Sequence, residues 1–391
     1  MYIFVIISVI YPPERMPLPR PFMKIVRILI PLLLTSTLHA ATVDVYFGTG
    51  GGQAQGIYRA SLDSEQGKLS PASLAAELDA PEFLAFHPDR TKLYAIAKVD
   101  SKPSVVAYQV AADGALEQLH AEPIPGGGAA HISVHPSGQF LLTAQYGAGS
   151  VALFPLTEDG ALLPCQQVIQ HQGGSRVVAH RQNSPHPHWT GFSPDGRFAL
   201  VPDLGLDQIV IYQVQFEPVS IERIGHADSV PGGGPRHMKF SLDGRFIFLL
   251  NELNLSVSTL AYDADSGSAQ LLASAPTLSE AVKAQQASNS GSEILVHPNG
   301  QFVYAANRGH DSVSAFQIAP DGSLERIDVE AIRGAWPRNI NIDSSGRWLL
   351  AAGAHSNTVT VLAIDPDSGS LQYPGKRVIS VPNVICILLN D

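Results

Sequence analysis

The sequence predicts an all-β protein, a seven-bladed β-propeller formed by a chain of 391 residues. Three observations favour this fold class. One unit recurs six times, and it consists of a short apolar strand, a turn rich in Pro, Asp and Gly, and a second apolar strand. The turns of successive units lie 46 to 58 residues apart, and a period of roughly 40–50 residues made of strands is typical of a propeller. No helical spacing is visible inside the period, which argues against a leucine-rich or helical array.

The six full units follow one another along most of the chain. They span residues 82–97, 130–145, 187–202, 235–251, 293–307 and 338–353. In the first unit Arg90 stands where the later units have a turn glycine. Those glycines are Gly138, Gly196, Gly244, Gly300 and Gly346. A third strand and often a fourth follow each unit, as in residues 311–320 and 321–328.

The two ends of the chain are expected to supply the seventh blade together. The chain shows strand patterns over 43–49 and 56–71, and nothing that resembles the first strand of a blade precedes Val43. The missing strand is present at the other end, over 381–390. We therefore expect the C-terminal strand to pair with the N-terminal segment, which leaves no free sheet edge. One segment, 278–290, has the pattern of a short helix capped by Ser279, and we expect it to be a surface insertion.

The first 40 residues do not follow the propeller pattern. Lys24 and Arg27 precede an apolar run over 28–34, and small residues end the segment at Ala40. This order is that of a secretory signal peptide. The apolar run is short and contains Pro31, which argues against a membrane-spanning helix. A buried N-terminal strand is the alternative interpretation.

The expected organisation is a signal peptide over 1–40, with Met23 as an alternative start, and a propeller domain over 41–391. The protein would then be periplasmic or secreted, without a stable membrane span once the signal is removed. Residues 1–40 hold four cations and one anion, so their removal would move the net charge from −10 to −13. No basic patch remains to neutralise phosphates, which argues against nucleic acid as a partner. Cys165 and Cys386 are expected to be separate buried thiols, although an oxidising compartment would permit a disulfide.

Charged and imidazole side chains interrupt the apolar pattern where a unit begins its first strand or ends its second. In a propeller these points meet around one mouth of the central channel, so groups from several units would form a polar pocket there. A single charged group at a strand end can instead hold a turn or cap the backbone. The hypothesis therefore rests on several units that supply such groups at one level. The segments concerned are 181–188, 201–207, 232–237, 251–252, 307–311 and 336–339.

These segments resemble the motifs of the seven-bladed lactonase family, which includes the propeller type of 6-phosphogluconolactonase and the related carboxymuconate cycloisomerases. The resemblance runs from about Val43 to the C-terminus. It rests on Arg181-Gln-x-x-Pro-His-x-His188, Val201-PDLGL-Asp207, Gly234-Pro-Arg-His237, Asn251-Glu252 and Asn307-Arg-Gly-His-Asp311. The sequence departs from the family pattern at Gln145-Tyr146, where an Asn-Tyr pair is usual. It departs again over 353–355, where a turn that contains Asn is common.

The resemblance implies that His188, Arg236, Glu252 and Arg308 take part in catalysis. We expect His188 to be the base that takes a proton from water, oriented or assisted by Glu252. Arg236 and Arg308 would hold the carbonyl oxygen and any carboxylate or phosphate of the substrate. Further residues are expected to bind substrate or to orient these four, namely His186, Asp203, Asp207, His237, Asn251, His310 and Arg338.

The resemblance implies a lactonase that hydrolyses a small sugar-type lactone. A signal peptide conflicts with a cytosolic phosphorylated sugar, and this favours an unphosphorylated aldonolactone or another exported lactone. Two alternatives stay open: a muconate-type cycloisomerase, which would consume no water, and a non-enzymatic envelope propeller that binds a ligand. The sequence has no G-x-S-x-G elbow for a covalent nucleophile and no metal-ligand spacing such as H-E-x-x-H. We expect neither a metal nor another cofactor, and the sequence indicates no oligomeric state.

Overall fold

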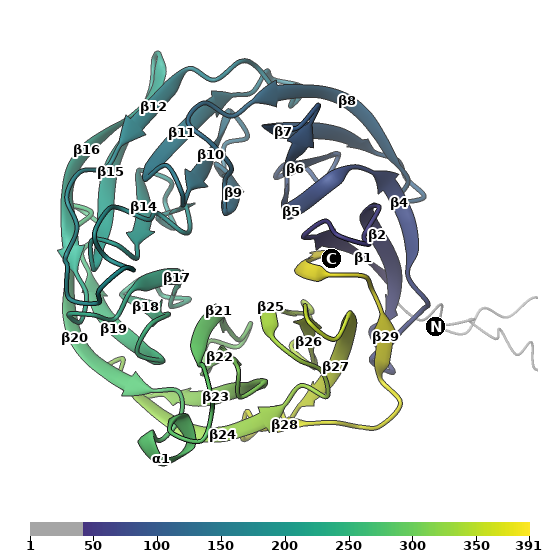
Figure 1. Ribbon diagram of the computed structural model, residues 1–391, viewed down its shortest axis with the longest axis vertical. Coiled ribbons are helices and arrows are strands. Elements are labelled where there is room, and N and C mark those ends of the chain that lie inside the picture. The colour runs from purple at the N-terminus through teal and green to yellow at the C-terminus, as the bar shows by residue number, and fades with distance from the viewer. Residues whose placement is uncertain (1–41) are drawn as a thin grey trace, which may run out of the picture. The chain divides into compact units, whose positions relative to one another are not determined.

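The computed structural model describes residues 42–391, which form seven antiparallel sheets arranged as blades around a central axis (Figure 1). This arrangement confirms the prediction of an all-β, seven-bladed propeller. The predicted signal peptide over 1–40 lies outside the described residues. Helix α1 (Glu280–Lys283) begins after the predicted cap Ser279, but it is shorter than the predicted segment 278–290.

Five blades contain four strands each, and in each blade the strands pair in chain order from the axis outward. The first two are β5–β8 (Asp79–Phe86, Lys92–Val99, Lys102–Val110, Leu116–Pro123) and β9–β12 (His131–Val134, Phe140–Gln145, Ser150–Pro155, Gln167–Gln170). The next two are β13–β16 (Gly191–Phe192, Phe198–Asp203, Gln208–Phe216, Val219–Asp228) and β17–β20 (Pro235–Phe240, Phe246–Asn251, Ser256–Tyr262, Ala269–Pro276). The fifth is β21–β24 (Ser290–Val296, Phe302–Arg308, Ser312–Ile318, Leu324–Ala331). The sixth blade consists of β25–β28 (Pro337–Ile342, Trp348–Gly353, Thr358–Ile364, Leu371–Gln372), with β29 (Val378–Ser380) also paired to β27.

The seventh blade joins the two ends of the propeller. Strand β1 (Thr42–Thr49) pairs on one side with β30 (Val384–Asn390) and on the other with β2 (Gly56–Asp63). Strand β2 also pairs with β3 (Lys68–Leu69) and with β4 (Ser73–Glu77). The β1–β30 ladder is antiparallel and takes up most of both strands. The predicted closure of the ring by the C-terminal strand is therefore confirmed.

Seven clusters of buried apolar side chains hold the ring together, one at each interface between neighbouring blades. Between the blades of β22 and β26, for example, Phe302 and Tyr304 pack with Leu349 and Ala351. The second strands β10, β14 and β18 are buried along their whole length. A fully buried large apolar side chain stabilises the fold by about 1.5–3 kcal/mol, so these interfaces explain why the second strands read as continuous apolar runs.

The turns within the repeated units also connect neighbouring blades. The imidazole Nε2 of His135 donates to the carbonyl of turn residue Gly196, and that of His297 donates to Gly346, at 2.9 and 2.8 Å. The turn glycines have φ near +70°, which is unfavourable for other residues. In the first unit Arg90 adopts φ +63° at the same place, as the repeat pattern predicts.

Buried tyrosine hydroxyls form a second set of contacts between blades, and these contacts permit a test. The hydroxyl of Tyr304 donates to the carbonyl of Gly369 in the next blade at 2.9 Å. Tyr304→Phe should lower the free energy of unfolding by about 1–3 kcal/mol, because the buried carbonyl loses its partner. Chemical denaturation measures this difference. Tyr108→Phe is the matched control, since the Tyr108 hydroxyl is buried without a hydrogen-bond partner among residues 42–391. Equal losses in both variants would contradict the role of the bond.

The two cysteines are free thiols. Cys386 is buried within β30, whereas Cys165 is half-buried. The prediction of separate thiols is confirmed, but Cys165 is less buried than expected because it lies in the loop before β12 and packs only against the edge of a blade interface.

Candidate active site

The repeat places one side chain from each unit in a ring around the axis. The residue eight positions before the turn residue begins the innermost part of each blade. In chain order these residues are Glu82, Ala130, His188, Arg236, Ser292 and Arg338. Several of them lie where the innermost strand is bulged, as at Arg236 and Arg338, so that an extra residue has no partner on the neighbouring strand. Bulges redirect side chains, and here they direct polar groups toward the channel.

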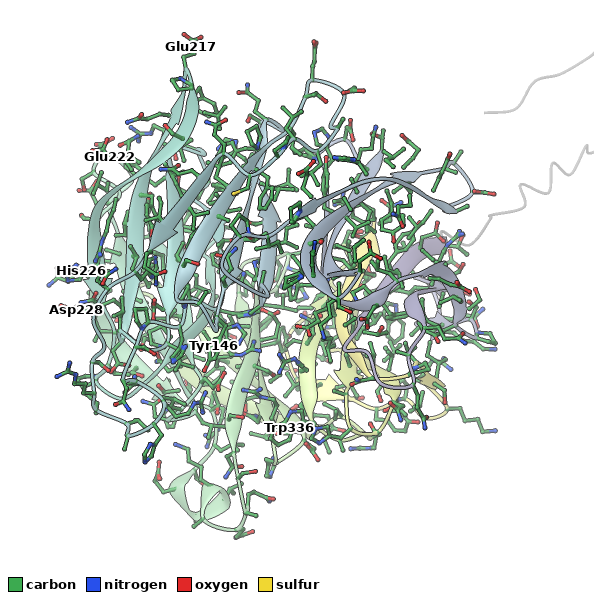
Figure 2. All side chains as sticks on the ribbon, turned by 45° about the horizontal axis from the view of Figure 1, so that its top comes forward. Tyr146, Glu217, Glu222, His226, Asp228 and Trp336 are labelled. Carbon is green, nitrogen blue, oxygen red and sulfur yellow. The ribbon has the colours of Figure 1, made fainter. Side chains whose placement is uncertain are left out.

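This ring surrounds a cavity of about 410 Å³. Four ring residues line it, namely Glu82, Ala130, His188 and Arg338. Tyr146, Glu252 and Arg308 line it from the ends of second strands, and the remaining lining residues are Gly128, Ala129 and Gly147. A narrow space of about 10 Å³ is lined by Arg236, His237 and Ile385 together with Glu82 and Arg338. Figure 2 shows Tyr146 and Trp336 toward the interior of the view, whereas the labelled residues of the β15–β16 hairpin lie along its outer edge. The structure thus brings together the four predicted catalytic residues.

Glu252 follows strand β18 and is held by three arginines. Arg181 donates to Oε1 at 2.6 Å and Arg236 donates to Oε2 at 3.0 Å, while Nη2 of Arg308 lies 3.0 Å from Oε2. Burial opposes ionisation of this carboxyl, but Arg308 and Arg236 together lower its pKa well below the usual range. Glu252 is therefore a carboxylate at any pH near neutrality.

Two of these arginines also bind backbone carbonyls of β21. Arg308 donates to Gly291 at 2.6 Å, and Arg236 donates to Ser292. Arg236 is almost wholly buried, whereas Arg308 lines the cavity and lies over the ring of Trp336. Burial lowers the pKa of both guanidinium groups. Arg236 thus fixes Glu252 from behind, and Arg308 presents a cation to the cavity.

His188 presents a neutral imidazole to the cavity. Burial, assisted by the charge of Arg236, lowers its pKa well below 6.5. Its Nδ1 atom is buried and has no hydrogen-bond partner within residues 42–391. Its ring lies edge-on to those of Tyr146 and His237, each at 5.3 Å between centroids. No hydrogen bond joins His188 to Glu252 in the described chain, so Glu252 influences His188 through its charge.

Asp203 and Asp207, predicted to bind substrate or to orient the catalytic residues, are bonded to backbone and side chains around them. Asp203 is fully buried, accepts the backbone N–H of His186 at 2.7 Å and pairs with Nδ1 of His171 at 2.6 Å. Asp207 accepts Gln182 at 2.6 Å and the N–H groups of two glycines of the 232–234 loop. Both carboxylates therefore fix the loops that carry the cavity residues.

The other predicted supporting residues also hold the site in place. His186 stacks on Tyr146 at 4.5 Å and bonds its carbonyl. Asn251 ties the end of β18 to Ser256 and Ser258, and His310 bonds Ser312 in the turn after Arg308. Gln145, which replaces the usual Asn, makes similar bonds to Thr143 and Ser150.

The side chain of His237 is hydrogen-bonded within the protein, whereas that of Arg338 is not. Nδ1 of His237 lies 2.9 Å from Oε1 of Glu293, whose other oxygen accepts the amide of Asn339. Arg338 is half-buried, lines both cavities and makes no hydrogen bond or ion pair with residues 42–391. It is the cavity cation that is free to contact a ligand.

Comparison with known proteins places this geometry in a family. The sequence profile described as "Lactonase, 7-bladed beta-propeller" matches residues 44–389. The chain belongs to this lactonase family. A 6-phosphogluconolactonase of Bacillus subtilis is 34% identical over 339 residues, which are 86% of this chain and 95% of the relative. The resemblance inferred from the motifs is confirmed, and this lactonase is a carboxylic ester hydrolase.

Solved structures agree with the assignment. A Lactobacillus plantarum protein is similar with a TM-score of 0.84 and 28% identity, over 90% of this chain and 100% of that chain. A periplasmic gluconolactonase of Pseudomonas aeruginosa is similar with a TM-score of 0.81 and 27% identity, over 89% and 99% of the two chains.

Three polar residues of the candidate site, Tyr146, Arg181 and Glu82, were not among the predicted site residues. Arg181 lies in a motif that the sequence singled out, but its bond to Glu252 depends on a contact between residues 71 positions apart. Glu82 begins the first repeated unit and holds the ring position of His188, Arg236 and Arg338. Counting back from the turn residue of each unit would have found it.

Within residues 42–391 of the lactonase, no helix combines the length and apolar character that a membrane crossing requires. The same residues contain no cluster of three or more His, Cys, Asp or Glu side chains suited to hold a metal ion. The expectation that no metal or other cofactor takes part stays a prediction.

Proposed function

We propose that this lactonase hydrolyses a gluconolactone-type sugar lactone in the cavity at the mouth of the channel. The observation that supports this most is the position of His188, a neutral buried imidazole that shares a cavity of about 410 Å³ with Arg308 and Arg338. A neutral base beside fixed cations suits the attack of water on an ester carbonyl, where negative charge develops on oxygen. The names of the Bacillus and Pseudomonas relatives support the same substrate class.

In the proposed mechanism His188 takes a proton from water as the water oxygen attacks the lactone carbonyl. The resulting imidazolium is stabilised by the charge of Glu252, which raises the pKa of His188 against the effect of burial. Arg308 stabilises the negative oxygen of the tetrahedral intermediate. Arg236 acts through Glu252, because its guanidinium is already bonded to Glu252 and to the carbonyl of Ser292.

Proton release on δ-gluconolactone and on 6-phosphogluconolactone tests this proposal. Purified protein should accelerate hydrolysis above the spontaneous rate on at least one of the two. A folded protein that accelerates neither would overturn the proposed substrate class. Product analysis separates hydrolysis from a cycloisomerase reaction, which incorporates no water.

Arg338 is the side chain that we expect to recognise an anionic substituent such as a phosphate. Arg338→Gln should raise KM for 6-phosphogluconolactone by about 10- to 100-fold, since a hydrogen bond to a charged group contributes about 1.5–3 kcal/mol. KM for δ-gluconolactone should change little. Stability should be unaffected, because Arg338 has no protein partner among the described residues. Arg223→Gln, on the exposed part of β16, is the control. Equal changes in KM on both substrates would contradict phosphate recognition by Arg338.

We further propose that the lactonase is exported and acts in the periplasm or outside the cell. The order of charged, apolar and small residues over 1–40 and the periplasmic Pseudomonas relative support this location. Mass spectrometry of the protein from a periplasmic fraction should give a chain that begins near residue 41. An intact chain in the cytosol would contradict export.

A further inference from the structure

Hydrolysis of a lactone needs an acid as well as a base. The ring oxygen leaves as an alkoxide, which is a poor leaving group unless it is protonated as the bond breaks. Water attacks the carbonyl carbon from one face of the ester plane, whereas the departing oxygen lies in that plane, so the two proton transfers occur at different positions. A second proton-bearing group that lines the cavity apart from His188 would therefore complete the site.

Glu82 lines the same cavity as His188 from another blade. It occupies the same ring position as His188, but two blades away, and the small residue Ala130 occupies the ring position between them. Ala130 and the neighbouring Gly128 line the cavity, so no large side chain at these positions separates the two groups. Glu82 lines both the large cavity and the narrow space beneath it.

The two carboxyl groups that line the cavity have pKa values shifted in opposite directions. Glu252 is bonded to three arginines and stays ionised. Glu82 makes no hydrogen bond or ion pair with residues 42–391. Burial raises its pKa above 4.5, although Arg338 on β25 and Lys98 on β6 oppose the shift. Arg236 and His237 on β17 line the same narrow space as Glu82, whereas Ala130 and Ile385 face it without charge. Carboxyl groups whose environments separate their pKa values in this way commonly divide acid and base roles.

We propose that Glu82 is the general acid of the reaction, which donates its carboxyl proton to the ring oxygen as the carbonyl–oxygen bond breaks. This inference rests on the proposed lactone hydrolysis. Water loses one proton to His188 and forms the new carbon–oxygen bond, and the leaving oxygen gains a proton from Glu82. The proton on His188 then returns to Glu82 through solvent, and the hydroxy acid product loses its own proton. The net reaction is lactone plus water to hydroxycarboxylate plus one proton.

Glu82→Gln keeps the size of the side chain but removes the proton that it would donate. The variant should lower kcat on δ-gluconolactone or its 6-phosphate by about 10²-fold, with a smaller change in KM. A general acid is active only while protonated, so wild-type kcat should fall as pH rises through the pKa of Glu82. This basic limb should disappear in Glu82→Gln. Glu82→Asp, which retains a carboxyl, should recover part of the rate.

An aryl lactone, dihydrocoumarin, supplies a second measurement. Its phenolate leaves without needing an acid, so Glu82→Gln should lose much less activity on it than on the sugar lactone. Glu325→Gln on the exposed strand β24 is the matched control and should behave as wild type.

The outcomes separate this inference from the proposed function. A wild-type protein without lactone hydrolysis overturns both. If the wild type is active but the basic limb of its pH profile is also seen in Glu82→Gln, only the acid role is overturned. The same holds if Glu82→Gln raises KM without lowering kcat. Loss of the basic limb together with a loss of kcat that depends on the leaving group supports it.

Discussion

Replacing His188 by asparagine should lower kcat for lactone hydrolysis by about 10²–10⁴-fold, the usual contribution of a positioned general base. The His188 side chain lines the cavity, and its Nδ1 atom has no partner among residues 42–391, so one ring nitrogen is not engaged in holding the fold. Stability should therefore change little. Steady-state kinetics on the better of the two sugar lactones, with thermal unfolding of both proteins, measures the two quantities.

The pH dependence gives an independent check of the same assignment. A base must be unprotonated, so the rate falls as pH drops through its pKa in the free enzyme. Because burial and Arg236 lower the pKa of His188, the acid limb of kcat/KM should lie below pH 6.5, the usual value for histidine. Activity should accordingly be constant between that limb and the basic limb expected of Glu82. An acid limb above pH 6.5 would contradict the buried neutral imidazole.

A control variant distinguishes the loss of His188 from the loss of a histidine elsewhere in the protein. His226 is exposed on β16 and lies 3.5 Å from Asp228 on the outer edge of a blade (Figure 2). His226→Asn should retain wild-type kinetics. If His188→Asn also retained full turnover in a folded protein, His188 would not be the base.

The propeller could be predicted because its determinants are local and repeated. The apolar runs, the turn residues and their period mark the first two strands of each blade, and closure by β30 follows from the one missing first strand. Strands β4 and β29 were not predicted as separate elements. They are outer strands with mixed burial, so their sequences carry little of the apolar pattern that marks an inner strand.

The sequence predicted most of the polar residues that form the site but not the ion pairs and hydrogen bonds between them. Strand-end positions indicated which side chains meet at the channel. That Arg181, Arg236 and Arg308 share one carboxylate depends on side-chain contacts between distant units. The same holds for Asp203, whose bond to His171 lets it support the loops around the cavity.

Removal of the Glu252 carboxylate should have the largest effect on stability at the site. Glu252→Ala leaves two almost fully buried guanidinium groups, those of Arg236 and Arg308, without the anion that neutralises them. Breaking a buried ion pair from one side typically costs about 3–5 kcal/mol, because a buried charge remains uncompensated. We expect a loss of this size in the free energy of unfolding, and loss of lactone hydrolysis as Arg308 moves.

Formate provides the decisive control for this interpretation, because it restores a carboxylate without restoring the side chain. In Glu252→Ala the thermal midpoint should rise with formate concentration more than in wild type, since a ligand that binds only the folded state stabilises it by mass action. Glu325→Ala removes an exposed carboxylate on β24 and should show neither the loss nor the formate response. A Glu252→Ala protein as stable as wild type would mean that the arginines tolerate one another without a counter-ion. In that case the role of Glu252 would lie in its charge beside His188 alone.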